Sequence, residues 1–170
     1  KGEPIPTLQQ VIDAARGLIR LNIEIKPHGH EEKLVERIVE IVAENDFQSQ
    51  CVLSSLDYPS VAKAKQLDQR LQVGHIVTVA IGNVAKLDVD FLSLNQEKAT
   101  SGYVRSLHRA GKQVHVWTVN DRQRMSTLVD FGVDNIITDD PETLIAVLAE
   151  RAEMSPTERI LLGVRNWLAQ

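Results

Sequence analysis

Six short strand-like runs recur along the chain of 170 residues, and segments with helical periodicity separate them. Their spacing is typical of βα units, in which a helix connects each strand to the next. This alternation predicts an α/β fold with a parallel sheet and right-handed crossovers. The runs are residues 21–26, 51–56, 73–79, 89–94, 114–119 and 135–139.

Residues that favour helix boundaries flank several of the intervening segments. Thr7 followed by Gln10 forms a capping box in front of a helical pattern. Gly111 and Gly132 stand where helix C-termini need a left-handed residue. Asp140 followed by a proline predicts the start of another helix. The boundaries therefore agree with the alternation of strands and helices.

The chain shows no low-complexity linker and no close repeat, so we interpret residues 1–154 as one domain. Residues 155–170 are expected to form an amphipathic C-terminal helix that could pack on the domain or on a partner. The apolar side of that helix is predicted to carry Ile160, Leu161, Val164 and Leu168.

Composition excludes several classes of protein. The 23 acidic and 19 basic residues give a net charge of −4, and no basic cluster suggests nucleic acid as a partner. The single cysteine, Cys51, excludes a disulfide scaffold. No apolar run is long enough to span a bilayer, and the start resembles no signal peptide. Because the sequence starts with Lys1 rather than Met, we expect the natural protein to begin further upstream.

The run LNIEIK carries two charges on one side of a strand. Leu21, Ile23 and Ile25 alternate with polar residues and would share the apolar face. Glu24 and Lys26 would project from the other face. Burying unpaired charges is costly, so they are predicted to face a site at the carboxyl ends of the strands. The alternative is a partly buried salt bridge.

Other strands also end in polar residues. Ser54 and Ser55 could bind a substrate hydroxyl or phosphate, although serine in this place more often caps the next helix. Asp139 and Asp140 resemble a metal-binding pair, but the following proline makes a helix cap the better interpretation. Asn120 and Asp121 are likewise interpreted as a helix cap before any role in the pocket wall.

A Rossmann-type sheet is the alternative fold, but no G-x-G-x-x-G or P-loop pattern follows any strand.

Several segments together, in order, carry a resemblance that none carries alone. They are IPTLQQVID, LNIEIK, VLSSLDYPSV, DFLSLNQ, HRAGKQVHVWTVND and GVDNIITDDPE. In this order they resemble the C-terminal part of the glycerophosphodiester phosphodiesterase family. The resemblance implies a TIM (β/α)8 barrel, of which this chain would form about six of the eight βα units. It also implies metal-dependent hydrolysis of a glycerophosphodiester, such as glycerophosphocholine, to glycerol 3-phosphate and an alcohol.

The resemblance assigns roles to three residues. Glu24 matches an acidic metal ligand, and a carboxylate suits a hard cation such as Ca²⁺ or Mg²⁺. Lys26 matches a basic residue that would bind the phosphate and offset charge in the transition state, so we assign it a catalytic and a substrate-binding role. Trp117 matches an aromatic residue that lines the substrate pocket, with a core tryptophan as the alternative.

The sequence departs from the family in one large respect. The family's histidine-arginine-glycine strand end, its acidic pair and its second histidine are absent and would precede Lys1. The chain is therefore expected to hold part of a site. His28 and His30, in the loop after the site strand, are possible substitutes for the missing histidines, although a solvated loop is the likelier interpretation.

These observations leave three hypotheses and a set of expected partners. The chain is part of a phosphodiesterase, a non-catalytic module that binds the phosphate compound, or an aldolase-type barrel in which Lys26 forms a Schiff base. Six strands of eight would leave two open edges, which predicts association with the missing upstream segment or with a second copy. The sequence does not predict the cellular compartment, since a membrane tether could come only from an upstream region.

Overall fold

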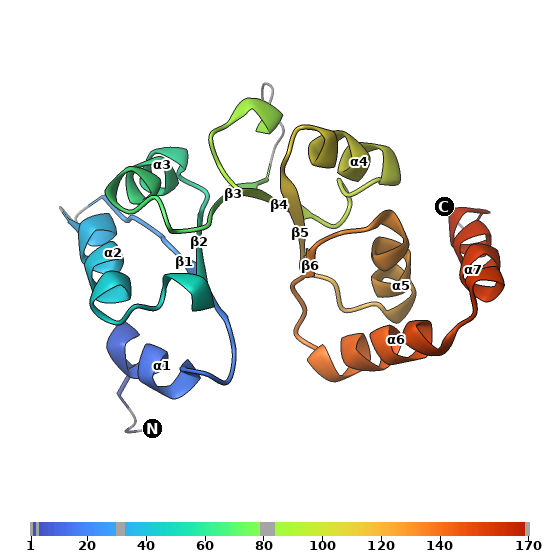
Figure 1. The fold of residues 1–170 in the computed structure, drawn as a ribbon, viewed down its shortest axis with the longest axis horizontal. Coiled ribbons are helices and arrows are strands. Elements are labelled where there is room, and N and C mark those ends of the chain that lie inside the picture. The colour runs from blue at the N-terminus through green and yellow to red at the C-terminus, as the bar shows by residue number, and fades with distance from the viewer. Residues whose placement is uncertain (1, 3, 30–32, 79–83, 169–170) are drawn as a thin grey trace. The chain divides into compact units, whose positions relative to one another are not determined.

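The structure is a computed structural model that describes residues 2, 4–29, 33–78 and 84–168. The chain forms two compact units, Lys1–Leu92 and Ser93–Gln170, and strand β4 crosses the boundary between them. Strands and helices alternate in both units, as the sequence predicts (Figure 1). No helix in the described part of the chain is both long and apolar enough to cross a membrane.

In its described residues the first unit contains three complete strands and three α-helices. Its strands are neighbours in chain order and pair in parallel, with Leu21 beside Cys51 and Leu53 beside Val73. Helix α3 packs on β2 and β3, and α2 packs on α3. The elements are α1 Leu8–Ala15, β1 Leu21–Glu24, α2 Leu34–Glu44, η1 Gln48–Gln50, β2 Cys51–Ser55, α3 Tyr58–Leu67, β3 Val73–Val77, η2 Val84–Lys86 and the start of β4, Phe91–Asn95.

As far as residue 168, the second unit contains the end of β4, two further strands and four helices. Strands β5 and β6 pair in parallel, with His115 beside Asn135. Helix α4 packs on β5, and α5 contacts α4, α6 and α7. The elements are α4 Ser101–Arg109, β5 Gln113–Trp117, α5 Arg122–Phe131, β6 Asn135–Ile136, α6 Pro141–Glu153 and α7 Pro156–Leu168.

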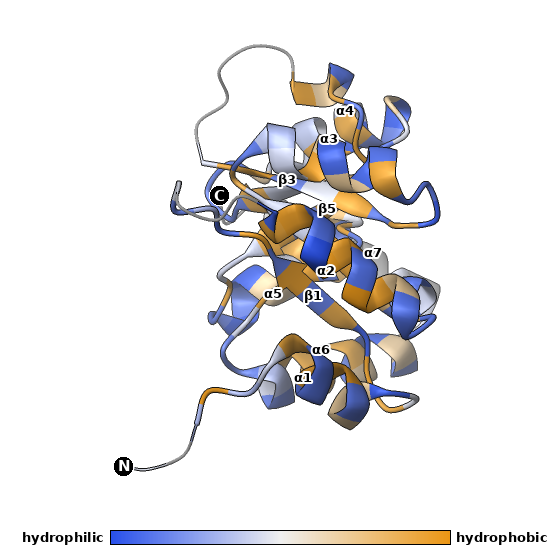
Figure 2. Cartoon of the chain, turned by 90° about the vertical axis from the view of Figure 1, so that its left-hand side faces the viewer, coloured by the Kyte–Doolittle hydropathy of each residue, from blue (hydrophilic) through white to orange (hydrophobic). Residues whose placement is uncertain are grey.

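Local sequence explains where these elements start and stop. The capping box of α1 is formed, because Thr7 accepts a hydrogen bond from the Gln10 amide and the Gln10 side chain accepts one from the Thr7 amide. Helix α5 ends at Gly132, whose φ of 77° is the left-handed conformation that glycine adopts without strain. Along α2, Val35, Val39 and Val42 are buried at helical spacing. Figure 2 shows the mixture of hydrophilic and hydrophobic residues on the outer helices.

The predicted C-terminal helix is present as α7. Leu161 and Val164, on its predicted apolar side, are 65% and 51% exposed. Leu162, on a neighbouring side, lines a cavity of the second unit, and Gly163 lies near Asp130 of α5. Helix α7 thus contacts α5 through a neighbouring face, and packing of the predicted apolar side on a partner stays a prediction.

Candidate functional site

Glu24, the last residue of β1, and Lys26, two residues after it, meet at the carboxyl end of the strand. Lys26 Nζ lies 3.2 Å from Glu24 Oε2. The Glu24 side chain is 36% exposed and that of Lys26 is 63% exposed, so neither charge lies in a dry core. Alternation explains this placement, because Ile25 between them is 1% exposed and faces the core. The pair leaves a carboxylate and an ammonium group accessible to a ligand.

Two polar side chains lie on the same face of the sheet as Glu24. In the β1–β2 register Glu24 stands beside Ser54, and parallel neighbours share a face. Ser54 Oγ donates a hydrogen bond to Asn22 Oδ1 at 3.0 Å. Alternation in the sequence places Asn22 on the face of Glu24 and Lys26, although it assigns Asn22 no role. The site face of β1 and β2 therefore carries Asn22, Glu24, Lys26 and Ser54.

Ser55, the second serine of β2, connects two parts of the backbone. Ser55 is fully buried, and its hydroxyl donates to the Ile25 carbonyl at 2.6 Å. The same oxygen accepts a hydrogen bond from the Asp57 amide at 3.0 Å. Asp57, rather than either serine, is the N-cap of α3 and accepts from the Ser60 amide. Ser55 thus connects the end of the site strand to the start of α3.

Glu24 is the single predicted metal ligand of the chain. Ca²⁺ takes six to eight oxygen ligands, and Mg²⁺ takes six. Within residues 2–168 as far as the structure describes them, no group of three or more His, Cys, Asp or Glu side chains could hold a metal ion. The role of Glu24 as a metal ligand therefore stays a prediction.

Trp117 lies in the second unit, at the end of β5. Its side chain is partly buried, and its indole N–H is buried without a hydrogen-bond partner among the described residues. Buried indole N–H groups usually have an acceptor, so a ligand oxygen would satisfy this donor. The role of Trp117 in a pocket wall stays a prediction.

The histidines take separate positions. His28 lies in the exposed loop after β1, whereas His30 lies outside the described residues. His75 Nδ1 is 3.2 Å from the Ser55 carbonyl, and its ring meets the edge of Tyr58. His108 pairs with Asp134 on the exposed side of the second unit. The fifth histidine, in β5, is buried.

The acidic residues after β5 and β6 cap helices. Asp121 accepts from the Arg124 amide at 2.7 Å and starts α5. Asp140 accepts from the amide and hydroxyl of Thr143, and these hydrogen bonds hold the pKa of its carboxyl below the usual value. Asp139 accepts from the Asn120 amide group at 2.8 Å. The cap interpretation is thus confirmed for Asp121 and Asp140.

Parallel strands alternating with helices, and charged residues at a strand's carboxyl end, define the class of TIM-barrel α/β proteins, here with six of the eight βα units. The model of the glycerophosphoryl diester phosphodiesterase family matches residues 1–143. This chain belongs to that family.

Individual relatives agree with the assignment. A glycerophosphodiester phosphodiesterase from Caldanaerobacter subterraneus is 30% identical over 154 residues, which include 85% of this chain and 62% of the relative. The crystal structure of a glycerophosphodiester phosphodiesterase from Parabacteroides distasonis matches with a TM-score of 0.80 and 26% identity. The match covers 89% of this chain and 67% of the chain of that enzyme. A phosphodiesterase from Oleispira antarctica, solved in complex with the product sn-glycerol-3-phosphate, matches with a TM-score of 0.77 and 26% identity, covering 85% and 61%.

The chain is shorter than these proteins. It spans 62% or 63% of the length of three curated relatives that it matches.

Proposed function

We propose that the chain takes part in hydrolysis of glycerophosphodiesters, which releases glycerol 3-phosphate and an alcohol. The observation that carries this proposal is the exposed pair of Glu24 and Lys26 at the carboxyl end of β1, in a chain of this family. The complex of the Oleispira antarctica relative with sn-glycerol-3-phosphate supports the choice of product.

Each member of the pair has a distinct role in the proposal. The Lys26 ammonium binds a phosphate oxygen and stabilises negative charge that develops during hydrolysis. The Glu24 carboxylate contributes one ligand to a divalent cation, Ca²⁺ or Mg²⁺, and holds the ammonium in place when the site is empty of substrate. Ser54, which stands beside Glu24 in the β1–β2 register, is proposed to contact the substrate.

The other hypotheses fit the pair less well. A Schiff-base lysine is usually desolvated, whereas Lys26 is 63% exposed and lies 3.2 Å from a carboxylate. A non-catalytic module would bind glycerol 3-phosphate without hydrolysis, and no feature of the described residues favours it over the enzyme.

The test is release of glycerol 3-phosphate from glycerophosphocholine by the purified chain, with Ca²⁺ or Mg²⁺ and then with a chelator. Where turnover occurs, we expect the chelator to abolish it and Glu24→Gln to lower it by at least about 100-fold, since the variant loses a charged ligand. Glu36→Gln is the control, because Glu36 also pairs with a lysine, Lys63, but on the exposed surface of α2. Binding of glycerol 3-phosphate without turnover would instead favour the non-catalytic module.

A further inference from the structure

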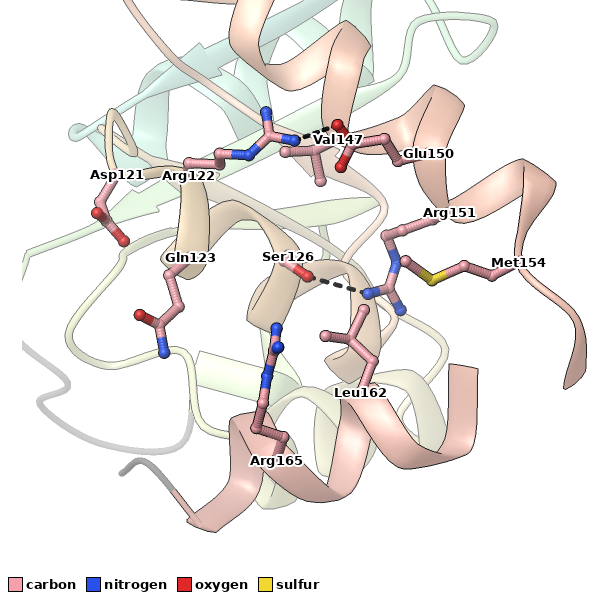
Figure 3. A pocket seen from close by; sticks show the side chains of 10 residues that line it. All are labelled: Asp121, Arg122, Gln123, Ser126, Val147, Glu150, Arg151, Met154, Leu162 and Arg165. Atoms are coloured by element: carbon pink, nitrogen blue, oxygen red, sulfur yellow. Dashed lines mark hydrogen bonds and ion pairs between the residues drawn. The ribbon is translucent and has the colours of Figure 1, made fainter. Parts of the chain in front are cut away.

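A cavity of about 620 Å³ lies within the second unit, where α5, α6 and α7 meet (Figure 3). Six of its ten lining residues follow residue 143, where the match to the family model ends. The proposed hydrolytic residues Glu24 and Lys26 belong to the first unit. The cavity is thus formed largely by a part of the chain that the family's activity does not explain.

Three arginines line the cavity, and two of them are neutralised by carboxylates. Arg122 pairs with Glu150 of α6. Arg151 pairs with Asp130 of α5 and donates to Ser126 Oγ at 3.0 Å. Their guanidinium groups therefore connect α5 to α6.

The third arginine has no such partner. Arg165 lies on α7, is exposed, and makes no ion pair or hydrogen bond with any residue that the structure describes. Figure 3 shows its side chain extending from α7 toward Ser126, with Leu162 beside it. The planar guanidinium group of Arg165 is thus directed toward the cavity, and no carboxylate among the described residues pairs with it.

The remaining acidic group of the lining contacts another part of the chain. The Asp121 carboxylate accepts the Arg124 amide hydrogen bond at the start of α5. Its negative charge therefore faces the partial positive charge of the helix N-terminus. The formal charges of the lining residues and Asp130 sum to zero, but Arg165 is the lining cation that no carboxylate among the described residues contacts, so it is the group left to bind an anion.

One side of the cavity is apolar. Val147 of α6, which is 3% exposed, lines it together with Met154 and Leu162. Met154 and Leu162 are partly exposed, so a ligand that carries a short hydrocarbon chain would cover them and remove their surface from water. Methionine adapts its shape readily, which suits a chain of variable length.

We propose that this cavity binds a small amphiphilic anion, with a phosphate or carboxylate head on Arg165 and a short apolar chain against Val147, Met154 and Leu162. The guanidinium fork matches the paired oxygens of either head group. This inference does not depend on the proposed hydrolytic function.

The test is a titration of the ¹⁵N-labelled chain with n-hexyl phosphate, followed by NMR amide shifts. We expect saturable shifts on α5, α6 and α7, and a loss of affinity of roughly three- to tenfold in Arg165→Gln, because the lost contact is charge-assisted but exposed to water. Arg105→Gln is the matched control, since Arg105 is also exposed and lies in α4. It should bind like the wild type.

Further titrations identify the head group that binds and the place where the probe binds. Equal affinity for hexanoate would assign the site to anions in general, and weaker binding of hexanoate would assign it to phosphate monoesters. The proposal is overturned if hexanol binds as tightly, if Arg165→Gln binds like the wild type, or if no saturable shifts occur. It also fails if Lys26→Gln abolishes the shifts, because the probe would then occupy the proposed hydrolytic site.

Discussion

The ring of Phe91 fills the space in which Gly74 would carry a side chain. A Cβ placed on Gly74 would lie 2.1 Å from Cε2 of Phe91, which is far inside van der Waals contact. Phe91 is 1% exposed, so its ring has little room to move. The contact joins β3 to the start of β4 on the face that also carries Glu24 and Ser54, since Gly74 stands beside Ser54 in the register.

Gly74→Ala is therefore expected to destabilise the chain. Overpacking of a rigid core costs about 1–3 kcal/mol, and we expect a loss at the upper end of this range in urea unfolding. Gly102→Ala is the control, because Gly102 lies in the first turn of α4 with no atom near its missing Cβ, so alanine there should not lower the stability. Equal effects of the two substitutions would contradict the packing described for Phe91.

Asp68 stabilises the turn after α3 through several hydrogen bonds. It accepts from the amide and guanidinium of Arg70 and from Gln48 Nε2 at 2.9 Å, and the Arg70 hydrogen bond chiefly holds the pKa of its carboxyl far below the usual value. Asp68→Asn should cost roughly 1–2 kcal/mol at pH 7.

The pH dependence of that loss follows from the lowered pKa. The folded state favours the Asp68 carboxylate, so its contribution is present above the unfolded pKa of 3.8 and disappears as the pH falls below it. The difference in unfolding free energy between wild type and Asp68→Asn should thus be constant near neutral pH and shrink below about pH 4. A difference that stays constant down to pH 2.5 would contradict this account.

Cys51 is expected to be unreactive in the folded protein. Its thiol is fully buried in β2, and burial raises its pKa to about 11. Iodoacetamide at pH 8 should modify it in urea but not in buffer.

The raised pKa of Cys51 stabilises the folded state below the unfolded value of 9.0, and this contribution is lost as the pH rises toward 11. Wild type should therefore lose stability relative to Cys51→Ala between pH 9 and 11.

The outer edge of β1 is a proposed pairing surface. β1 stands at one end of the strand order, with β2 on its other side. Because the Ile25 amide donates to Ser54, strand alternation directs the amides of Asn22 and Glu24 to the outer edge. We expect association at low micromolar concentration in gel filtration, and less of it in Asn22→Pro, which removes an outward donor. A wild-type chain that elutes as a stable monomer would refute the proposal.

Much of this fold follows from local sequence. The alternation in LNIEIK predicted the buried Ile25 and the exposed Glu24 and Lys26, and the short-range signals at Thr7 and Asp140 predicted helix starts. Such features depend on neighbours within four residues, so periodicity and cap chemistry suffice to find them.

Other features depend on contacts between distant residues. The sequence does not show that Phe91 covers Gly74, 17 positions earlier, or that Leu162 rather than Leu161 faces the cavity. An isolated helix with apolar residues on neighbouring faces has no unique inner side, and packing on α5 decides it. Arg165 likewise differs from the other arginines of the cavity only through the carboxylates that the fold brings to Arg122 and Arg151.

The most direct test of the proposed site is the affinity of the chain for glycerol 3-phosphate, measured by calorimetry in wild type, Lys26→Gln and Lys63→Gln. Both lysines pair with a glutamate, Lys26 with Glu24 at 3.2 Å and Lys63 with Glu36 at 2.7 Å, but only Lys26 lies at the end of the site strand. We predict that Lys26→Gln weakens binding by about tenfold or more, because a charge-assisted contact to phosphate is lost, and that Lys63→Gln leaves it unchanged. Equal affinity of wild type and Lys26→Gln would contradict the assignment of the phosphate to Lys26.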